Sequence, residues 1–287
     1  MNTNQTTVKA FVGGTLIDGN GGDPVSNAAV VVIGSAIESA GAKDQIAIPE
    51  GAQVFDVSGK TLMPGMFDCH AHLTIASPSI EKMLFTHRTY AAFKTAEIMK
   101  RTLHAGFTTV RDAGGMDVGF RQAVVDGLIE GPRMVISGML GQTGGHADWY
   151  FPSGAQPLKD MMLDNIIICD GLPDVQKGAR KLLRLGIDFI KICATGGVTS
   201  PADAPEYTEW TPEELAAIVY EAKARNREVM AHAEGTQGIK NAVRAGIWSI
   251  EHGAMLDDEA IDMMLEAGTY LVPTLFVVED IFSRGAE

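Results

Sequence analysis

Histidine and lysine side chains recur where short apolar stretches of this 287-residue chain end. The first stretch runs into an Asp-x-His-x-His sequence that contains His70 and His72, and later stretches carry Lys191, His232 and His252. Because side chains alternate along a strand, His70 and His72 share one face and lie ~7 Å apart along the chain. Two imidazoles at this spacing can hold one divalent ion. Taken together, the five residues predict a metal centre.

Taken singly, these residues also have structural explanations. A His-x-His pair occurs by chance, and a lone His232 or His252 is more often a hydrogen-bonded histidine of the core. Lys191 is different, because it lies inside the apolar sequence Ile-Asp-Phe-Ile-Lys-Ile-Cys, where burying an unpaired ammonium is costly. We therefore expect this lysine to be paired, neutralised or chemically modified. A lyase that forms a Schiff base through Lys191 is a weaker alternative, since it leaves the histidines unexplained.

Strand and helix alternate regularly from residue 61 onward, and the candidate ligands fall on or just after the strands. Helices are expected at 79–104, 211–226 and 257–267, the second of them opening with the cap sequence Thr-Pro-Glu-Glu. The strands are expected at 61–67, 107–111, 133–137, 187–193, 228–232, 247–251 and 269–275. This alternation predicts an α/β fold of the TIM (β/α)8 type, whose chemistry lies at the carboxyl ends of the strands. Seven strands leave such a barrel open, so we expect the eighth unit to be missing.

The first 60 residues have a different pattern. Segments 7–17, 28–40 and 53–57 are rich in β-forming residues and are separated by turns that contain Gly and Pro. No helix of useful length fits between them. We therefore predict two domains, a partial β-sandwich at 1–60 and an incomplete barrel at 61–287.

Composition narrows the class of protein. The formal charge of −13 disfavours a nucleic-acid partner, because a polyphosphate would be repelled overall. No apolar run approaches the ~18 residues that a membrane span needs, and no signal peptide is apparent at the N-terminus. Three cysteines suit a reducing compartment better than a disulfide framework. We expect a cytoplasmic protein with no membrane and no nucleic-acid partner.

Residues 63–72, Met-Pro-Gly-Met-Phe-Asp-Cys-His-Ala-His, resemble the Pro-Gly-x-x-Asp-x-His-x-His signature of the amidohydrolase superfamily. Residues 141–148, 190–198 and 249–253 are similar to motifs of the imidazolonepropionase-related branch, which includes Xaa-Pro dipeptidases and N-acyl-amino-acid hydrolases. The resemblance covers the whole chain. It implies a metal-dependent hydrolase that cleaves a C–N amide bond of a dipeptide or an N-acyl amino acid. A cyclic amide, such as an imidazolone or hydantoin, is the alternative substrate.

The resemblance also implies metal ligands. His70 and His72 would bind one buried divalent ion, and His232 and His252 would bind a second. Lys191 would bridge the two ions as a carbamate formed with CO2, which turns an unwanted buried cation into a bidentate anion. The site would hold one or two ions, with Zn²⁺ expected first. A hydroxide bridging them would be the nucleophile, its pKa lowered from ~15.7 toward ~7.

Three residues are candidates for contact with an amide substrate. By the resemblance, the catalytic and substrate-binding residue His146 would polarise the scissile carbonyl or bind the substrate carboxylate; a surface loop histidine is the alternative. Glu234 could favour a cationic group of the substrate, or be merely solvated. Tyr207 precedes a helix over the active face, where a lid contact and simple packing are equally expected.

Three further charged residues lie on or next to the predicted strands. Arg111, in the sequence Arg-Asp-Ala-Gly-Gly after the second barrel strand, either shapes the pocket or belongs to a structural turn. Glu251 and Asp188 are neighbours of strand-face residues, so strand alternation predicts that they point toward the helical layer.

The resemblance implies one more ligand, an aspartate after an eighth strand that passes a proton to the leaving amine. Nothing after His252 fits this role, because Asp257, Asp258 and Asp262 open the following helix and Asp280 lies in the tail. We expect a C-terminally truncated chain that forms a homo-oligomer or is completed by a missing C-terminal fragment. A barrel that binds metal without turnover is the alternative.

Overall fold

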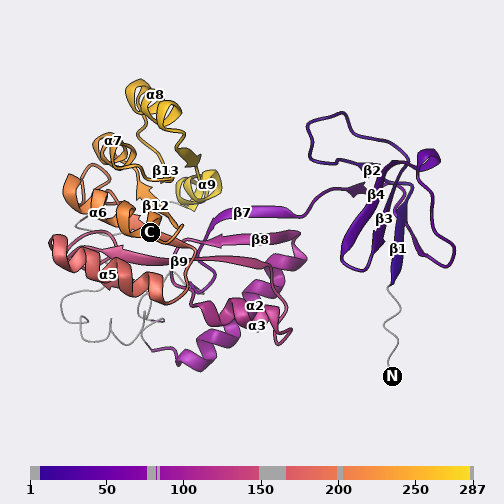
Figure 1. Cartoon of the computed structure of the whole chain (residues 1–287), viewed down its shortest axis with the longest axis horizontal. Helices are drawn as coiled ribbons and strands as arrows, with labels where there is room; N and C mark the ends of the chain where they lie inside the picture. Colours follow the sequence, from indigo (N-terminus) through magenta and orange to yellow (C-terminus); the bar gives the residue numbers. More distant parts are fainter. Residues whose placement is uncertain (1–6, 76–81, 83–84, 149–165, 199–202, 285–287) are drawn as a thin grey trace. The chain divides into compact units, whose positions relative to one another are not determined.

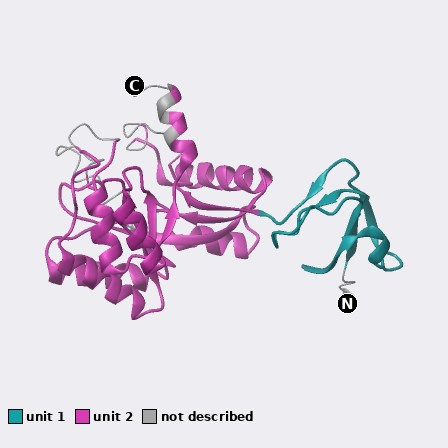
Figure 2. Cartoon of the chain, turned by 90° about the horizontal axis from the view of Figure 1, so that it is seen from above, with its two compact units in different colours: residues 1–65 teal, residues 66–287 magenta. Residues whose placement is uncertain are grey.

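A computed structural model describes residues 7–75, 82, 85–148, 166–198 and 203–284. The chain divides into two compact units, Met1–Gly65 and Met66–Glu287 (Figure 2). The division falls after Gly65 rather than after residue 60, because β6 (Thr61–Leu62) pairs with β2 (Thr15–Leu16) in the first unit. The expected strand 61–67 is therefore wrong as a single element. Within the described part of the chain, no helix is long and apolar enough to cross a membrane.

The N-terminal unit is a small mixed sheet. Its strand order is β4 (Ala36–Ala42), β3 (Ala28–Ile33), β1 (Val8–Val12) and β5 (Gln53–Asp56), and the β2–β6 ribbon is a separate pair of strands. A 3-10 turn, η1 (Lys43–Gln45), follows β4. Alternate residues of β3 face opposite sides, so Val31 packs with Val12 while Val30 packs with Leu16 of the ribbon. The ribbon thus covers one face of the sheet.

The second unit is a nearly closed barrel of parallel strands with helices, of the TIM type that the strand–helix alternation predicts (Figure 1). Its strand path runs β7-β8-β9-β11-β12-β13-β14, and β10 pairs only with β9. The strands are β7 (Met66–Ala71), β8 (Phe107–Asp112), β9 (Arg133–Gly141), β10 (Ile166–Ile168), β11 (Phe189–Cys193), β12 (Glu228–Ala233), β13 (Ser249–His252) and β14 (Tyr270–Val272). Among the described residues, the end strands β7 and β14 do not pair with each other.

Helices alternate with these strands and pack on them through one apolar core. The helices are α2 (Arg88–His104), α3 (Val118–Val125), α5 (Leu172–Arg184), α6 (Pro212–Lys223), α7 (Thr236–Ala245), α8 (Asp258–Ala267) and α9 (Leu275–Arg284). The predicted cap of α6 is present, since the Thr211 side chain accepts from Glu214 N while the Glu214 carboxylate accepts from Thr211 N. Part of the helix expected at 79–104 lies outside the described residues, and α2 begins at Arg88.

Strand side chains that face outward hold this helical layer. Ile136, Ile190 and Ile192 are fully buried in the core shared with the helices. Asp188 lies in the same layer, as alternation predicts, where it accepts from Arg121 of α3 and from Ile136 N. The outward face of the strands is therefore structural, which leaves the inward side chains and the strand ends for chemistry.

Candidate metal centre

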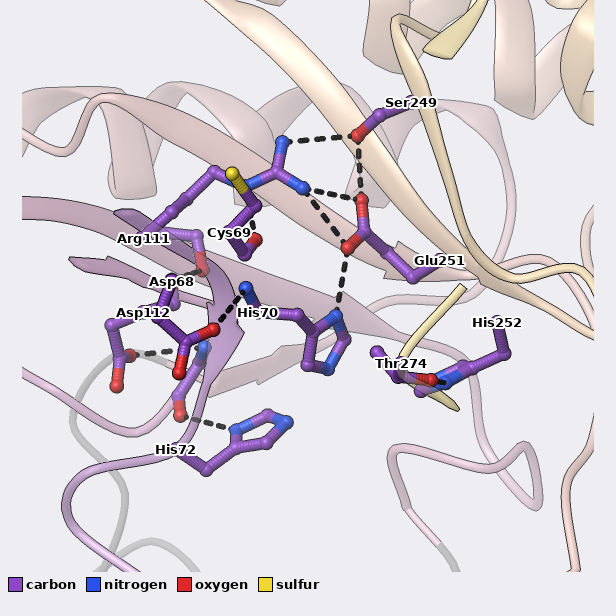
Figure 3. A network of polar contacts seen from close by, with 12 residues as sticks. Asp68, Cys69, His70, His72, Arg111, Asp112, Ser249, Glu251, His252 and Thr274 are labelled. Atoms are coloured by element: carbon purple, nitrogen blue, oxygen red, sulfur yellow. Dashed lines mark hydrogen bonds and ion pairs between the residues drawn. The ribbon is translucent and has the colours of Figure 1, made fainter. Parts of the chain in front are cut away.

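The strand ends bring the predicted histidines into one cluster. His70 comes from β7, His232 from β12 and His252 from the end of β13, while His72 follows β7. Ring centroids lie 5.2 Å apart for His70 and His72, 4.9 Å for His70 and His252, and 4.8 Å for His232 and His252. Figure 3 shows the rings of His70, His72 and His252 gathered at these strand ends. The barrel therefore joins side chains that lie up to 182 positions apart in sequence (252 − 70).

Each of these four imidazoles has one ring nitrogen held by the protein. The contacts are His70 Nδ1 to Glu251 Oε2 (2.7 Å), His72 Nδ1 to Gly114 O (2.9 Å), His232 Nε2 to Gly196 O (3.0 Å) and His252 Nδ1 to Thr274 Oγ1 (2.6 Å). A carbonyl or carboxylate can only accept, so His70, His72 and His232 present the other nitrogen as a lone pair. A metal-binding histidine typically has such an outer partner, which fixes the tautomer and the direction of the ring.

Burial keeps these rings neutral. It lowers the pKa of His72 to about 4 and that of His252 to about 3, with neighbouring His70 and Lys191 adding to the effect at His252. Burial also lowers the pKa of His70 and of His232 far below the usual range. A neutral imidazole is the form that binds a metal ion, so the cluster is ready for one at neutral pH.

Lys191 lies in β11 beside the cluster and is only 2% exposed. Its ammonium makes no hydrogen bond or ion pair with any residue of the described ranges, and burial lowers its pKa. No three His, Cys, Asp or Glu side chains in those ranges already stand at ligand spacing around an ion. The donor types nevertheless fit a divalent ion, because neutral imidazoles with oriented lone pairs lie near a buried lysine that has no partner in the described part of the chain.

His146 lies at the edge of the same cluster. The residue is 8% exposed, which makes the alternative of a surface loop histidine wrong. Its ring stacks on His232 with centroids 4.3 Å apart, and its Nδ1 lies 2.6 Å from Asp203 Oδ2. A Cβ on Gly197 would lie 2.5 Å from the His146 ring, so only glycine leaves room for the ring here.

A buried carboxyl that sequence reasoning missed holds the His146 loop. Glu209 is 4% exposed and its Oε1 accepts from His146 N at 2.5 Å. Within the described residues, its Oε2 is buried without a hydrogen-bond partner. Burial raises the pKa of Glu209 to about 8, so the group is mostly protonated at neutral pH. No local motif indicates this role, because Glu209 lies 63 positions after His146.

The other two substrate-binding candidates, Glu234 and Tyr207, differ in how far their side chains are exposed. The Glu234 side chain is 13% exposed, and its Oε1 lies 3.8 Å from His232 Nε2. Burial raises the pKa of Glu234. Tyr207 is 61% exposed, which excludes a packing role for its ring in the core. Trp210 supplies that packing instead, since its indole nitrogen donates to Cys193 O at 2.8 Å.

Glu251 lies at the centre of the site, so the expectation that it points toward the helical layer is wrong. The residue is fully buried, and its carboxylate accepts from Arg111, from Ser249 and from the ring of His70 (Figure 3). Alternation failed because His252 has a left-handed backbone, with φ of +72°. The turn at His252 lets two successive side chains, Glu251 and His252, serve one site. Arg111 is likewise part of the site rather than of a structural turn.

Two acidic residues that follow His252 in the chain, Asp257 and Glu259, have structural roles. Asp257 caps α8 by accepting from Ala260 N, and it also pairs with Lys240 at 2.8 Å. Lys240 makes a second ion pair with Glu259. Asp257 and Asp258 thus open the helix, as their positions in the sequence predict.

Residues 61–285 match the Amidohydrolase family. The chain therefore belongs to this family, whose members include metal-dependent hydrolases of C–N bonds. The resemblance drawn from residues 63–72 and from the three branch motifs is confirmed.

Three relatives define the branch. The sequence of ochratoxinase from Aspergillus niger is 32% identical, over 99% of this chain and 62% of its own length. The crystal structure of A. niger ochratoxinase matches with a TM-score of 0.88 and 33% identity, over 98% of this chain and 68% of that chain. A prolidase crystallised with N-methylphosphonate-L-proline has a TM-score of 0.84 and 37% identity, over 94% of this chain and 66% of that chain. Imidazolonepropionase from Cereibacter sphaeroides is 25% identical, over 90% of this chain and 67% of its own length. The chain thus spans less than two thirds of the ochratoxinase sequence.

Proposed function

We propose that this chain forms the larger part of a metal-dependent hydrolase that cleaves the C–N amide bond of a dipeptide or an N-acyl amino acid. The observation that carries the proposal is the cluster of four neutral imidazoles beside Lys191, a buried lysine without a partner among the described residues. The prolidase relative, at 37% identity, favours a dipeptide that ends in proline. The imidazolonepropionase relative is more distant, at 25%, so a cyclic amide is the less favoured substrate.

His70, His72, His232 and His252 would hold one or two divalent ions, with Zn²⁺ expected because it prefers nitrogen and oxygen ligands. Lys191 would complete the site as a carbamate. In that reaction its neutral amine forms an N–C bond to CO2 and releases a proton, which leaves an anion where an ammonium would be costly. A bound ion supplies Lewis-acid activation of water and of the scissile carbonyl.

The remaining residues of the site would bind and orient the substrate. His146, held by Asp203 at Nδ1, would polarise the carbonyl or bind the substrate carboxylate. Glu209 would keep the His146 backbone in place, because it accepts from His146 N. Glu234, whose Oε1 lies 3.8 Å from His232 Nε2, would attract a cationic group such as the ammonium of a dipeptide.

The test is an assay of the 287-residue chain after incubation with Zn²⁺ and bicarbonate. We expect slow, zinc-dependent hydrolysis of Xaa-Pro dipeptides or N-acyl amino acids, which a chelator abolishes. Hydrolysis of cyclic amides alone would replace the proposed substrate class. Loss of all C–N hydrolysis in a chain shown to contain zinc would contradict the proposed function.

A further inference from the structure

A chain of buried polar contacts runs across the barrel interior from β8 through β13 to β7 (Figure 3). Arg111 Nη2 donates to both oxygens of Glu251, at 2.7 and 2.9 Å. Ser249 Oγ donates to Glu251 Oε1 at 2.6 Å, and the His70 ring reaches Glu251 Oε2 at 2.7 Å. Glu251 is fully buried and every contact is made by a donor, so its carboxylate is held in one orientation.

We propose that Glu251 is a positioning residue that keeps the His70 proton on Nδ1 and thereby turns Nε2 toward the metal ion. A carboxylate can only accept, so the short contact to Nδ1 requires the proton on that nitrogen. The lone pair of the ring is then on Nε2, the nitrogen directed away from Glu251. The proposal deepens the proposed function and rests on it.

Arg111 and Ser249 hold this carboxylate in the orientation that contacts His70. Both donate to Oε1, and Arg111 also donates to Oε2, the oxygen that His70 contacts. These contacts oppose a rotation that would make Glu251 a metal ligand itself. Arg111 Nε also donates to Cys69 O at 2.7 Å, the carbonyl directly before His70. One guanidinium therefore fixes both the backbone that carries His70 and the carboxylate that orients its ring.

The surroundings keep the ion pair intact. The Arg111 guanidinium lies 5.3 Å from the Phe189 ring centroid and 5.7 Å from the Trp248 ring centroid. These two aromatic rings exclude water from the guanidinium. Among the four clustered histidines, His70 is held by a carboxylate at Nδ1, whereas His72 is held by the carbonyl of Gly114. A carboxylate partner raises the basicity of the ligand more than a carbonyl does. Loss of Glu251 should therefore weaken metal binding at His70.

The test compares Glu251→Gln with Glu221→Gln in the metal-free chain, using Zn²⁺ and a competing chelator to measure affinity. Glu221 is the matched control, because it also makes a paired contact with an arginine, Arg180, but in the helical layer. A glutamine at position 251 can turn its NH2 toward His70 and reverse the tautomer. We expect E251Q to bind Zn²⁺ about 10–100-fold more weakly and E221Q to match the wild type.

A purely structural role would lower the melting temperature of both metal-free variants and leave zinc affinity unchanged, and that result would overturn the proposal. If E251Q does not fold, ¹⁵N NMR of histidine-labelled wild-type chain decides instead. A proton on Nδ1 of His70 supports the proposal, and a proton on Nε2 overturns it. A wild-type chain that binds no Zn²⁺ would overturn the proposed function as well, whereas unchanged affinity in E251Q overturns only this inference.

Discussion

Replacing Lys191 by Met should stabilise the metal-free chain and weaken the metal-loaded one. In the metal-free chain the lysine is 2% exposed and has no partner among the described residues, so burial penalises its charged form and lowers its pKa. An apolar side chain of similar length removes this penalty. Replacing a buried ion pair or triad by apolar residues is often neutral or stabilising by about 1–4 kcal/mol, and we expect a gain in this range for a lysine without a described partner. Each kcal/mol raises the melting temperature by ~2–4 °C at this size.

The effect should depend on pH with a defined sign. Because the pKa of Lys191 is lower in the folded than in the unfolded chain, the unfolded chain binds more protons below the ordinary lysine value of 10.5. Wild-type stability therefore rises with pH toward that value. The advantage of Lys191→Met should therefore be larger at pH 7 than at pH 9.5.

Urea denaturation of chelator-treated protein measures both effects, with Lys240→Met as the control. Lys240 is also buried but pairs with Asp257 and Glu259, so its replacement should destabilise the chain. With Zn²⁺ and bicarbonate added, the wild type should gain stability and Lys191→Met should gain much less. A metal-free Lys191→Met chain that is less stable than the wild type at pH 7 would refute this reasoning.

Two further predictions concern the His146 loop. The raised pKa of Glu209 means that the folded chain holds a proton between pH 4.5 and about 8 that the unfolded chain releases. Stability should fall across that window by up to about 1.4 kcal/mol per pH unit, and denaturation of Glu209→Gln should show a shallower fall. His146→Gln should lower kcat by about 10²-fold without changing zinc content, as kinetics and elemental analysis can check.

The barrel could be predicted from the sequence because its strands are short apolar runs whose ends carry unusual residues. Six of the seven expected strands overlap single barrel strands, from β8 at Phe107 to β14 at Tyr270. The first was misplaced, since Thr61–Leu62 pairs with a strand of the N-terminal unit. That pairing depends on tertiary structure, although Pro64-Gly65, a turn signal, separates the two halves of residues 61–67.

The histidines and Lys191 could be found because their residue types are costly or unusual at strand ends. Glu251 was misplaced because strand alternation assumes a regular backbone, and the left-handed residue His252 interrupts it. Asp203 and Glu209 reach His146 from 57 and 63 positions away. Only the folded chain brings these carboxyl groups to the His146 loop, so spacing along the sequence carries no sign of them.

The metal content of the purified chain tests the central claim most directly. Elemental analysis after incubation with Zn²⁺ and bicarbonate should give one to two ions per chain, as expected for a site of this ligand type. A variant with both His70→Ala and His252→Ala should lose the metal, while His104→Ala should keep it, because His104 is an exposed residue that pairs with Glu130. Less than about a tenth of an ion per wild-type chain would contradict the account, since a ligand set of this type binds Zn²⁺ tightly.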